Sequence, residues 1–559
     1  MAPNRLTLSF LGGLGEIGKN VMSIGYGGEM LVVDCGLTFP DDEMLGVDIV
    51  IPDVSYLVQN RDRIAGLVLT HGHEDHTGAL PYVLPQLGAF PVYGSKLALG
   101  LAGAKLAESG HEVKAELKPV VAGDRVKVGP FEVEFFRVNH SIPDSMGLAI
   151  HTPVGLVLHT GDFKFDQTPV DGEVTDFGRL AEYGRQGVLV LLSDSTHADR
   201  AGYTPSEKVV GAQLDRIFRE AAGRILVTTF ASNVHRIQQA LSSAARDKRK
   251  VGVVGRSMVN TIDIASRLGY LEVEPGVLVG LDEALRLPDR QCLLMASGSQ
   301  GEPMSALTRI ARHEHPRVEI RPNDLVVLAA TPVPGNEKTV ARTVDDLYRS
   351  GARVVHPPLQ EVHVSGHASQ EELKMMINLT RPQYFVPIHG DYRNLVRHAE
   401  LATELGVPKD RTFVVENGAV LEFSSYHGRI AGKVDSGSVF VDGRGVGDVG
   451  SAVMRDRTQL SQEGIVVIAL TVDQAAGRVV AGPEIVTRGF VYVRESEELL
   501  NQLKGRVSAA VQELEGDLLD WPALKSKLRD TANGFLVERT GRHPMIMPLI
   551  MFSHDLANM

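Results

Sequence analysis

Cysteine is nearly absent from this chain of 559 residues, in which only Cys35 and Cys292 occur. Two cysteines exclude a fold that depends on a disulfide framework, and a reducing compartment is the simplest expectation. The sequence also lacks any run of about 18 apolar residues, so no membrane-spanning helix is expected. Its first residues lack the long apolar stretch of a secretory signal. We therefore expect a cytoplasmic protein.

Basic residues are not in excess either, because the formal net charge is −12. This balance argues against a protein coated in basic surface for duplex DNA. It does not exclude a nuclease, since bound metal ions would add positive charge that the amino-acid count omits. The run from Arg246 to Lys250 is a candidate basic patch, but a solvated helix end is the simpler interpretation.

Internal repeats and low-complexity tracts are also missing, and at roughly 100–200 residues per domain the length suggests about three domains. The first 200 residues alternate short β-rich runs with turns and intervening helices, which predicts stacked sheets with helices outside. After residue 205, helices alternate with apolar strands expected at 225–229, 251–254, 291–296 and 325–329. This alternation favours a parallel sheet. The pattern of short β-rich runs and turns returns near His363, so the second domain is predicted to be inserted into the first.

The last part of the chain differs from both preceding domains in its sequence pattern. A segment rich in Gly, Ser and Asp suits a linker. Beyond it we expect strands at 464–472, 489–493 and 545–552, with helices at 496–513 and 521–541, as in a small α+β module. The predicted boundaries are 1–204 and 356–425 for the two parts of the first domain, 205–355 for the insertion, 426–450 for the linker and 451–559 for the C-terminal domain.

The strongest chemical signal is the cluster His71-Gly72-His73-Glu74-Asp75-His76, which follows the buried strand pattern Leu67-Val68-Leu69-Thr70. Residues i and i+2 of an extended segment point to the same side, so His71 and His73 can grip one metal ion. Asp75 and His76 would lie at the following turn and face a second ion. Imidazole and carboxylate groups suit zinc.

Further ligands are expected at the ends of other strands. His140, Asp162 and His389 each follow an apolar strand-like run. Taken singly, each is more simply a capping or satisfied polar residue. The repetition of a strand followed by a ligand type favours a shared metal site with Asp162 as a bridging carboxylate.

These motifs resemble the metallo-β-lactamase fold, an αββα sandwich, in which an early aspartate, HxHxDH, a histidine, an aspartate and a late histidine occur in this order. Asp34 matches the early aspartate, and the resemblance implies that it orients metal ligands without touching metal. The inserted domain resembles that of the β-CASP nucleic-acid hydrolases. Asp194, His367 and His389 match the three further motifs of that subgroup.

Within the subgroup the chain is similar to the bacterial ribonuclease J family over its whole length. The stretches that carry this likeness are 12–20, 70–78, 229–233, 297–302 and 363–368. The resemblance implies cleavage of single-stranded RNA, both 5′→3′ exonucleolytic with a preference for a 5′-monophosphate and endonucleolytic, in rRNA processing and mRNA decay. It also implies two divalent metal ions, Zn²⁺ or alternatively Mn²⁺, homodimers or homotetramers, and contacts with other RNA-decay proteins.

The resemblance also assigns roles to residues. Asp75, Asp194 and His367 are the expected catalytic residues, with His367 giving a proton to the leaving 3′-oxygen. Gly298-Ser299-Gln300-Gly301 could present backbone N–H groups to a phosphate, although a plain strand-to-helix turn is an equal alternative. The expected RNA- or phosphate-binding residues are Ser232, Asn233, Gly298, Ser299, Gln300, His363, Ser365, Gly366 and His367.

Several alternatives stay open. Gly13-x-Gly15-x-x-Gly18 formally matches a dinucleotide fingerprint, but strand-like sequence follows it where a helix is required, so a hairpin is the better interpretation. A thioesterase or lactamase acting on small molecules would use the same metal scaffold without needing the insertion. A non-enzymatic RNA-binding scaffold would be expected to have lost ligands. A 3′-end-processing endonuclease would differ from an exonuclease by cutting RNA with a blocked 5′ end.

Overall fold

The structure, a computed structural model, describes residues 5–41, 43–110, 115–302, 304–333, 336–473, 478–491, 496–514 and 520–553. The chain divides into two compact units, Met1–Asp41 with Asp48–Val439 and Asp42–Val47 with Phe440–Met559. No described helix has the length and apolar character needed to cross a membrane.

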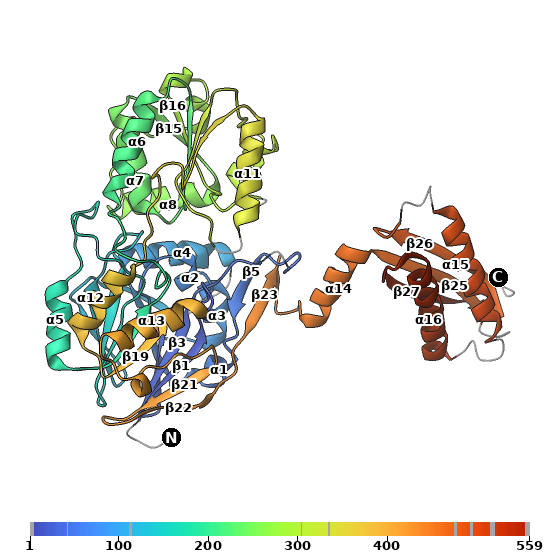
Figure 1. The fold of residues 1–559 in the computed structure, drawn as a ribbon, viewed down its shortest axis with the longest axis horizontal. Coiled ribbons are helices and arrows are strands. Elements are labelled where there is room, and N and C mark those ends of the chain that lie inside the picture. Colours follow the sequence, from blue (N-terminus) through green and yellow to red (C-terminus); the bar gives the residue numbers. More distant parts are fainter. Residues whose placement is uncertain are drawn as a thin grey trace. The chain divides into compact units, whose positions relative to one another are not determined.

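Two β-sheets packed face to face form the centre of the first unit (Figure 1). In sheet order, one consists of β22 (Gly428–Lys433), β21 (Ala419–Phe423), β1 (Leu6–Gly12), β3 (Val21–Tyr26), β4 (Glu29–Val33), β6 (Ile64–Val68), β7 (Pro91–Gly94) and β8 (Glu116–Pro119). The other consists of β19 (Tyr384–Ile388), β13 (Val188–Asp194), β12 (Leu156–His159), β11 (Met146–His151), β10 (Phe131–Arg137) and β9 (Arg125–Val128). Strand side chains alternate between faces, and one core joins the two sheets through Leu8, Phe10, Phe135, Leu192 and Val386.

Helices cover the outer faces of this sandwich. A second apolar cluster joins the outer face of the six-stranded sheet to α5 (Phe177–Gln186), α12 (Gln370–Thr380) and α13 (Tyr392–Glu404), through Leu158, Leu180, Leu373, Phe385 and Leu401 among others. On the larger sheet, α4 (Lys96–Ser109) contacts β7 and β8 and packs beside α3 (Leu80–Leu87). The predicted αββα sandwich is therefore confirmed.

The inserted domain is a parallel α/β sandwich. Its sheet has the order β15 (Lys250–Val254), β16 (Cys292–Ala296), β14 (Ile225–Thr228), β17 (Leu325–Leu328) and β18 (Arg353–Val355), with every pair parallel. One apolar cluster lies between the sheet and α6 (Lys208–Glu220), α7 (Val234–Arg246) and α8 (Arg256–Arg267). Another lies on the opposite face beneath α10 (Ala306–Ala311) and α11 (Glu337–Arg349). Burial on both faces explains why the three inner strands, β14, β16 and β17, are almost entirely apolar.

The insertion leaves the sandwich after β13 and returns before α12 and β19. Because β13 and β19 are parallel neighbours, their carboxyl ends lie at the same edge of the sheet. Asp194 at the end of β13 and His389 just after β19 are thereby brought together. The chain crosses between the domains at this edge, which also carries the candidate site.

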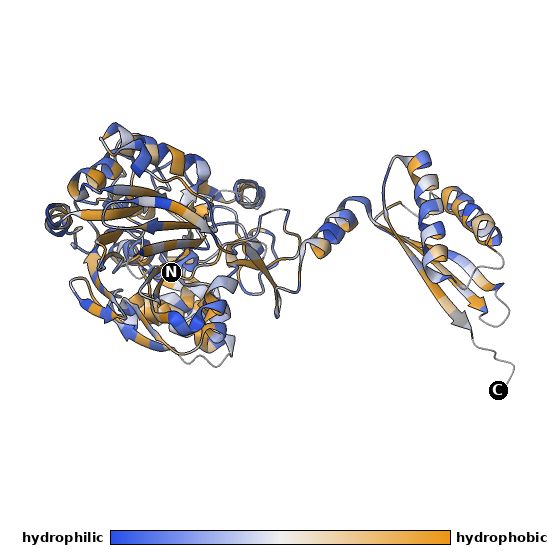
Figure 2. Ribbon diagram, turned by 90° about the horizontal axis from the view of Figure 1, so that it is seen from below, coloured by the Kyte–Doolittle hydropathy of each residue, from blue (hydrophilic) through white to orange (hydrophobic). Residues whose placement is uncertain are grey.

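The second unit is a small α+β domain. Its three-stranded sheet has the order β26 (Arg478–Arg488), β25 (Ile465–Asp473) and β27 (Met545–Ser553). Every second residue of β25 is buried against α15 (Glu497–Gln512) and α16 (Trp521–Thr540). In Figure 2 these two helices cover one face of the sheet. The remaining helix, α14 (Ser451–Glu463), has no buried residue.

One expected strand in this unit is wrong. We predicted a strand at 489–493, but the strand observed here is β26, which ends at Arg488. Gly489, Phe490 and Val491 follow its end as a bend, and 492–493 lie outside the described residues. The dipeptide Gly482-Pro483 precedes this end of the strand. It lies inside β26, an edge strand, where proline is tolerated and where the pairing with β25 shifts register.

Candidate metal centre

The HxHxDH cluster begins directly beyond β6. His71 and His73 stand on extended chain, and α2 (Glu74–Thr77) then turns Asp75 and His76 inward. Thr70, the residue before the cluster, is fully buried, and its backbone N–H donates to Asp34 Oδ1 over 2.8 Å. The end of β6 is thus tied to the end of β4, which sets the direction in which the cluster leaves the sheet.

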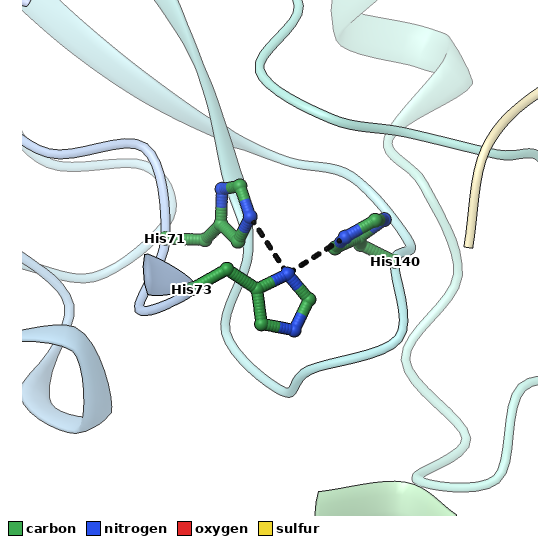
Figure 3. Close-up of side chains that lie close together, drawn as sticks. All are labelled: His71, His73 and His140. Atoms are coloured by element: carbon green, nitrogen blue, oxygen red, sulfur yellow. Dashed lines mark hydrogen bonds between the residues drawn. The ribbon is translucent and has the colours of Figure 1, made fainter. Parts of the chain in front are cut away.

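His71, His73 and His140 form the imidazole group, shown in Figure 3. Nδ1 of His73 lies 3.1 Å from Nε2 of His71 and 3.1 Å from Nε2 of His140. Burial, together with neighbouring histidines, holds the pKa of His71 and of His140 well below the usual range. Burial also lowers the pKa of His73 to about 4. The three rings are therefore neutral and present lone pairs to a common point.

Asp75, His76, Asp162 and His389 form the mixed group. Nε2 of His389 lies 3.1 Å from Asp75 Oδ2, and Nε2 of His76 lies 3.3 Å from Asp162 Oδ1. Burial opposes a charge on His389, but Asp162 and the neighbouring Asp75 and Asp194 outweigh it and raise its pKa to about 9. Two carboxylates thus give this group negative charge that the imidazole group lacks.

Asp162 links the two groups. Its Oδ2 lies 3.7 Å from Nε2 of His71 and 3.8 Å from Nε2 of His140. Its Oδ1 faces His76 of the mixed group, and the residue is 2% exposed. Oδ2 also lies 3.6 Å from Nε2 of His389 in the mixed group, so this carboxylate lies between the two groups, a position that suits the bridging role expected from the sequence.

Hydrogen bonds behind the site orient the histidine rings. Asp34 accepts from Nδ1 of His76 over 2.8 Å, and the carbonyl of Gly366 accepts from Nδ1 of His140 over 2.8 Å. Thr70 Oγ1 donates to Asp34 and so accepts from Nδ1 of His71. In the same way Thr196 Oγ1 donates to Asp194 and accepts from Nδ1 of His389 over 2.7 Å. Each bond occupies Nδ1 and leaves Nε2 facing the centre, which is the arrangement that metal-binding histidines need. The set of buried imidazoles and carboxylates therefore fits a divalent metal centre.

Asp194 and His367 form a pair beside this centre. Nδ1 of His367 donates to Asp194 Oδ2 over 2.8 Å. Burial opposes a charge on His367, but Asp194 outweighs it, and the pKa of the ring is raised. The ring centroid of His367 lies 4.9 Å from that of His140 and 5.5 Å from that of His389. The structure thus brings both residues to the edge of the metal ligands.

A cavity of about 290 Å³ opens in front of the ligands. The sandwich supplies His73, Asp75, His140, Asp162, His367 and His389, together with apolar side chains that include Ile17, Leu37 and Phe39. The inserted domain supplies Phe230, Ser232, Val333 and Asn336. The cavity is therefore walled by both domains, with the ligand groups on one side.

The predicted phosphate-binding residues fall into two sets. Ser232 and His367 line the cavity, but the other seven are not among its lining residues. The carboxamide of Asn233 caps α7 by accepting from the backbone of Arg236, and Gln300 bonds the backbone of Thr331 and of Val333. Ser299 is buried, Ser365 Oγ accepts from the backbone of His367, and His363 contacts Arg236 and Thr331. Protein partners thus occupy the side chains of Asn233, Gln300, His363 and Ser365.

Two of the glycines that were predicted to bind phosphate have steric roles. Gly298 has φ +101°, and a Cβ there would lie 2.3 Å from Ser305 Oγ. A Cβ on Gly366 would lie 2.6 Å from the ring of His140. Both positions exclude larger residues.

Sequence reasoning missed the residues that support the ligands, namely Thr70, Thr196 and Arg236. The hairpin prediction for 13–18 is confirmed, because β1 and β3 pair antiparallel across it and no helix follows. Sequence reasoning also did not predict that His159 and His197 lie at the site. Both lie close to the site, and burial lowers their pKa to about 4 and about 3.

Matches to models of known protein families define the class of this protein. Residues 14–210 match the metallo-beta-lactamase superfamily, and residues 354–414 match the Zn-dependent metallo-hydrolase RNA specificity domain. Residues 222–347 match the ribonuclease J beta-CASP domain, and residues 452–553 match the ribonuclease J C-terminal domain. The fold and site thus define a metallo-β-lactamase-type hydrolase with a β-CASP insertion.

Curated relatives narrow this class to a family. Ribonuclease J2 of Bacillus subtilis is 45% identical, with 97% of each chain covered. Ribonuclease J of Thermus thermophilus is 44% identical over 97% of this chain and 94% of its own. The chain belongs to the ribonuclease J family.

A crystal structure of a protein of unknown function from Enterococcus faecalis V583 shares the fold. Its TM-score is 0.55 at 20% identity, covering 75% of this chain and all of that one.

Proposed function

We propose that this protein is a metal-dependent ribonuclease that hydrolyses phosphodiester bonds of single-stranded RNA, 5′→3′ from a 5′-monophosphate end and also internally. The observation that carries the proposal is the convergence of the imidazole and mixed groups on a cavity whose far wall comes from the inserted domain. A thioesterase or lactamase for small molecules is not favoured, because it needs neither that wall nor the RNA specificity domain.

Two divalent cations are proposed as cofactors. His71, His73 and His140 would hold one, and Asp75, His76 and His389 the other, with Asp162 between them. Neutral imidazoles favour Zn²⁺, while the carboxylates of the mixed group would also accept Mn²⁺. When bound, such a pair supplies Lewis-acid stabilisation of the phosphate and a nucleophile at neutral pH.

The chain's own residues position and protonate the substrate. Because Nδ1 of His367 is bonded to Asp194, Nε2 is the atom that can give a proton to the leaving 3′-oxygen. The raised pKa of His367 keeps this proton available near neutral pH. Asp194 holds the ring in place and supports the imidazolium form, and Asp75 completes the proposed catalytic residues.

The cavity walls suit a single strand. Phe39, which is 48% exposed, and Phe230 offer faces on which bases can stack. Ser232 and His367 are the cavity-lining residues proposed to bind the phosphates. Gly298, Ser299, Ser365 and Gly366 are proposed to bind phosphate through their backbone N–H groups.

We also propose a homodimer or homotetramer in the cytoplasm. The domain boundaries expected from the sequence are kept as proposals except for the linker at 426–450, because β22 (Gly428–Lys433) belongs to the sandwich. The family resemblance supports the assembly, and so does the outer face of the sheet in the second unit. There Val486, Met547, Leu549 and Met551 are each nearly half exposed. Light scattering on the purified chain tests this, and a monomer at micromolar concentration would contradict it.

The test of the activity uses a short single-stranded RNA with a 5′-monophosphate and a 3′ label, with zinc or manganese supplied. The same RNA with a 5′-hydroxyl and the double variant Asp75→Ala, His76→Ala run beside it. We expect rapid loss of the monophosphate RNA only, abolished in the variant. Equal internal cutting of both RNAs would keep the nuclease and remove the 5′ preference. No cutting by fully metallated protein would overturn the proposal.

A further inference from the structure

Arg236 on α7 is a fully buried cation without a role in the proposed chemistry. Its side chain has 0% exposure. The guanidinium donates to both carboxylate oxygens of Glu207 over 2.7–2.9 Å. A bidentate pair of this kind has a fixed geometry. Arg236 therefore locks α7 to Glu207, which lies where the chain first enters the inserted domain.

The same guanidinium holds the segment on which the chain returns. Nη1 donates to Nδ1 of His363 over 2.7 Å and to the carbonyl of Ala329 over 2.6 Å, and Nη2 lies 3.3 Å from the carbonyl of Val364. Since arginine can only donate, His363 must be a neutral ring whose Nε2–H donates to Thr331 Oγ1. One side chain thus clamps both crossings between the domains.

The returning segment leads straight to the metal ligands. Two residues after Val364, the carbonyl of Gly366 accepts from Nδ1 of His140, and His367 then bonds Asp194. On the other side, Thr331 belongs to the loop whose Val333 lines the cavity. A shift of the returning segment would therefore turn the His140 ring and move the cavity wall together.

Other buried groups hold the outgoing crossing at the same place. Lys164 Nζ donates to the carbonyl of Pro205 over 3.1 Å, and Asp166 accepts from the backbone of Glu207 over 3.0 Å. The carboxylate of Glu372 accepts hydrogen bonds from the backbone N–H of Thr204, on the outgoing crossing, and from that of Ser369, on the returning one. The sandwich thus fixes Glu207, and Glu207 fixes Arg236.

We infer that Arg236 is a positioning residue for the metal centre, which acts by pinning the returning segment so that Gly366 orients His140. This inference rests on the proposed function for its catalytic consequence, but its effect on metal affinity does not. Loss of a group that orients a metal ligand typically weakens metal binding about 10–100-fold.

The test compares two matched pairs of substitutions in the full chain. Glu207→Gln with Arg236→Met removes the clamp without leaving an unpaired buried charge. Asp324→Asn with Arg224→Met removes another buried ion pair of the inserted domain, formed by residues that are 4% and 3% exposed. Zinc affinity of the metal-stripped protein, thermal unfolding and RNA cleavage are measured for both and for the wild type.

We expect the Arg236 pair to bind zinc about tenfold more weakly than wild type and to cleave RNA at least tenfold more slowly. The Arg224 pair should stay within about twofold of wild type at a similar melting temperature. Equal zinc affinity and cleavage in the two pairs would overturn the inference. If the wild type binds zinc but does not cut RNA, the proposed function is contradicted. The difference in zinc affinity between the two pairs would still test the role of Arg236.

Arg236→Lys covers the case in which the Arg236 pair does not fold. Lysine keeps a positive charge opposite Glu207. Its single nitrogen would have to replace the three guanidinium nitrogens that make the contacts of Arg236. The same weakening of zinc binding is expected, and wild-type affinity in this variant would likewise overturn the inference.

Discussion

The imidazole group and the mixed group differ in charge and in origin. His71, His73 and His140 are neutral rings, and burial is the main cause of their low pKa. In the mixed group, carboxylates outweigh the same burial and raise the pKa of His76 and His389. Burial lowers the pKa of the rings in both groups, so the carboxylates around His76 and His389, among them Asp75 and Asp162, account for the raised pKa of these two rings in the absence of metal.

This difference indicates how two cations would share the centre. A neutral all-nitrogen group gives a cation no charge compensation of its own, so it depends on the carboxylates beside it. Of these, Asp162 lies 3.7 Å from Nε2 of His71 and 3.8 Å from Nε2 of His140. The mixed group carries negative charge and harder oxygen donors, which manganese accepts as well as zinc. Asp162 is therefore the residue on which both groups depend.

The largest expected effect is that of Asp162→Asn. An amide cannot compensate the charge of either cation, so both groups should lose affinity and RNA cleavage should fall by at least about a thousandfold, because metal ions supply several kcal/mol in such sites. Metal content by elemental analysis and cleavage rates check this. Asp171→Asn, in the same loop region but outside the ligand groups, serves as control. Cleavage within tenfold of wild type would show that the groups do not depend on Asp162.

A paired comparison of His73→Ala and Asp75→Ala separates the groups. Each variant should retain one metal ion per chain, and each should lose cleavage by more than the roughly 10–100-fold that an outer partner costs. His73→Ala should respond to manganese better than Asp75→Ala, because only it keeps the intact carboxylate-bearing group. Identical metal preference in the two variants would break the distinction between the groups.

The candidate ligands could be proposed from the sequence because they have local signatures. His71, His73, Asp75 and His76 lie within six positions of one another after one strand, and His140, Asp162 and His389 each follow shortly after the end of another strand. Sheet topology then brings those strand ends together. Apolar runs also predicted four of the five strands of the inserted sheet to within a residue or two at each end, but not the short β18.

The supporting contacts have no such signature. Thr196 reaches His389 across 193 residues, and Arg236 reaches His363 across 127. A polar residue in a loop looks the same in the sequence whether it faces a substrate or bonds a backbone group. This is why Asn233, Gln300 and His363 were predicted to bind phosphate although the structure gives their side chains protein partners.

Gly366→Ala tests the orientation of the imidazole group alone. The added Cβ would lie 2.6 Å from the His140 ring, so the ring must shift. We expect zinc affinity to weaken about 10–100-fold at the imidazole group, as for other losses of an orienting contact. Isothermal titration of the metal-stripped protein measures it, and Gly432→Ala, where a Cβ meets open space, is the control. Unchanged affinity would remove Gly366 from the account of ligand orientation.

The smallest effect should come from Ser369→Ala. Ser369 begins α12 with a capping box to Glu372, beside the His367 loop but outside both ligand groups. Loss of such a cap typically costs about 1 kcal/mol. A slightly lower melting temperature with unchanged metal content is expected in thermal unfolding. A change in metal content would show that the two groups cannot be separated from the stability of the neighbouring helix.

The most direct test of a two-cation ribonuclease is a titration of RNA cleavage against metal equivalents. Metal-stripped protein receives Zn²⁺ in steps from zero to three equivalents per chain, and cleavage of the 5′-monophosphate RNA is measured at each step. The account predicts little cleavage through the first equivalent and full cleavage as the second binds. Full cleavage at one equivalent, with no further rise, would contradict it.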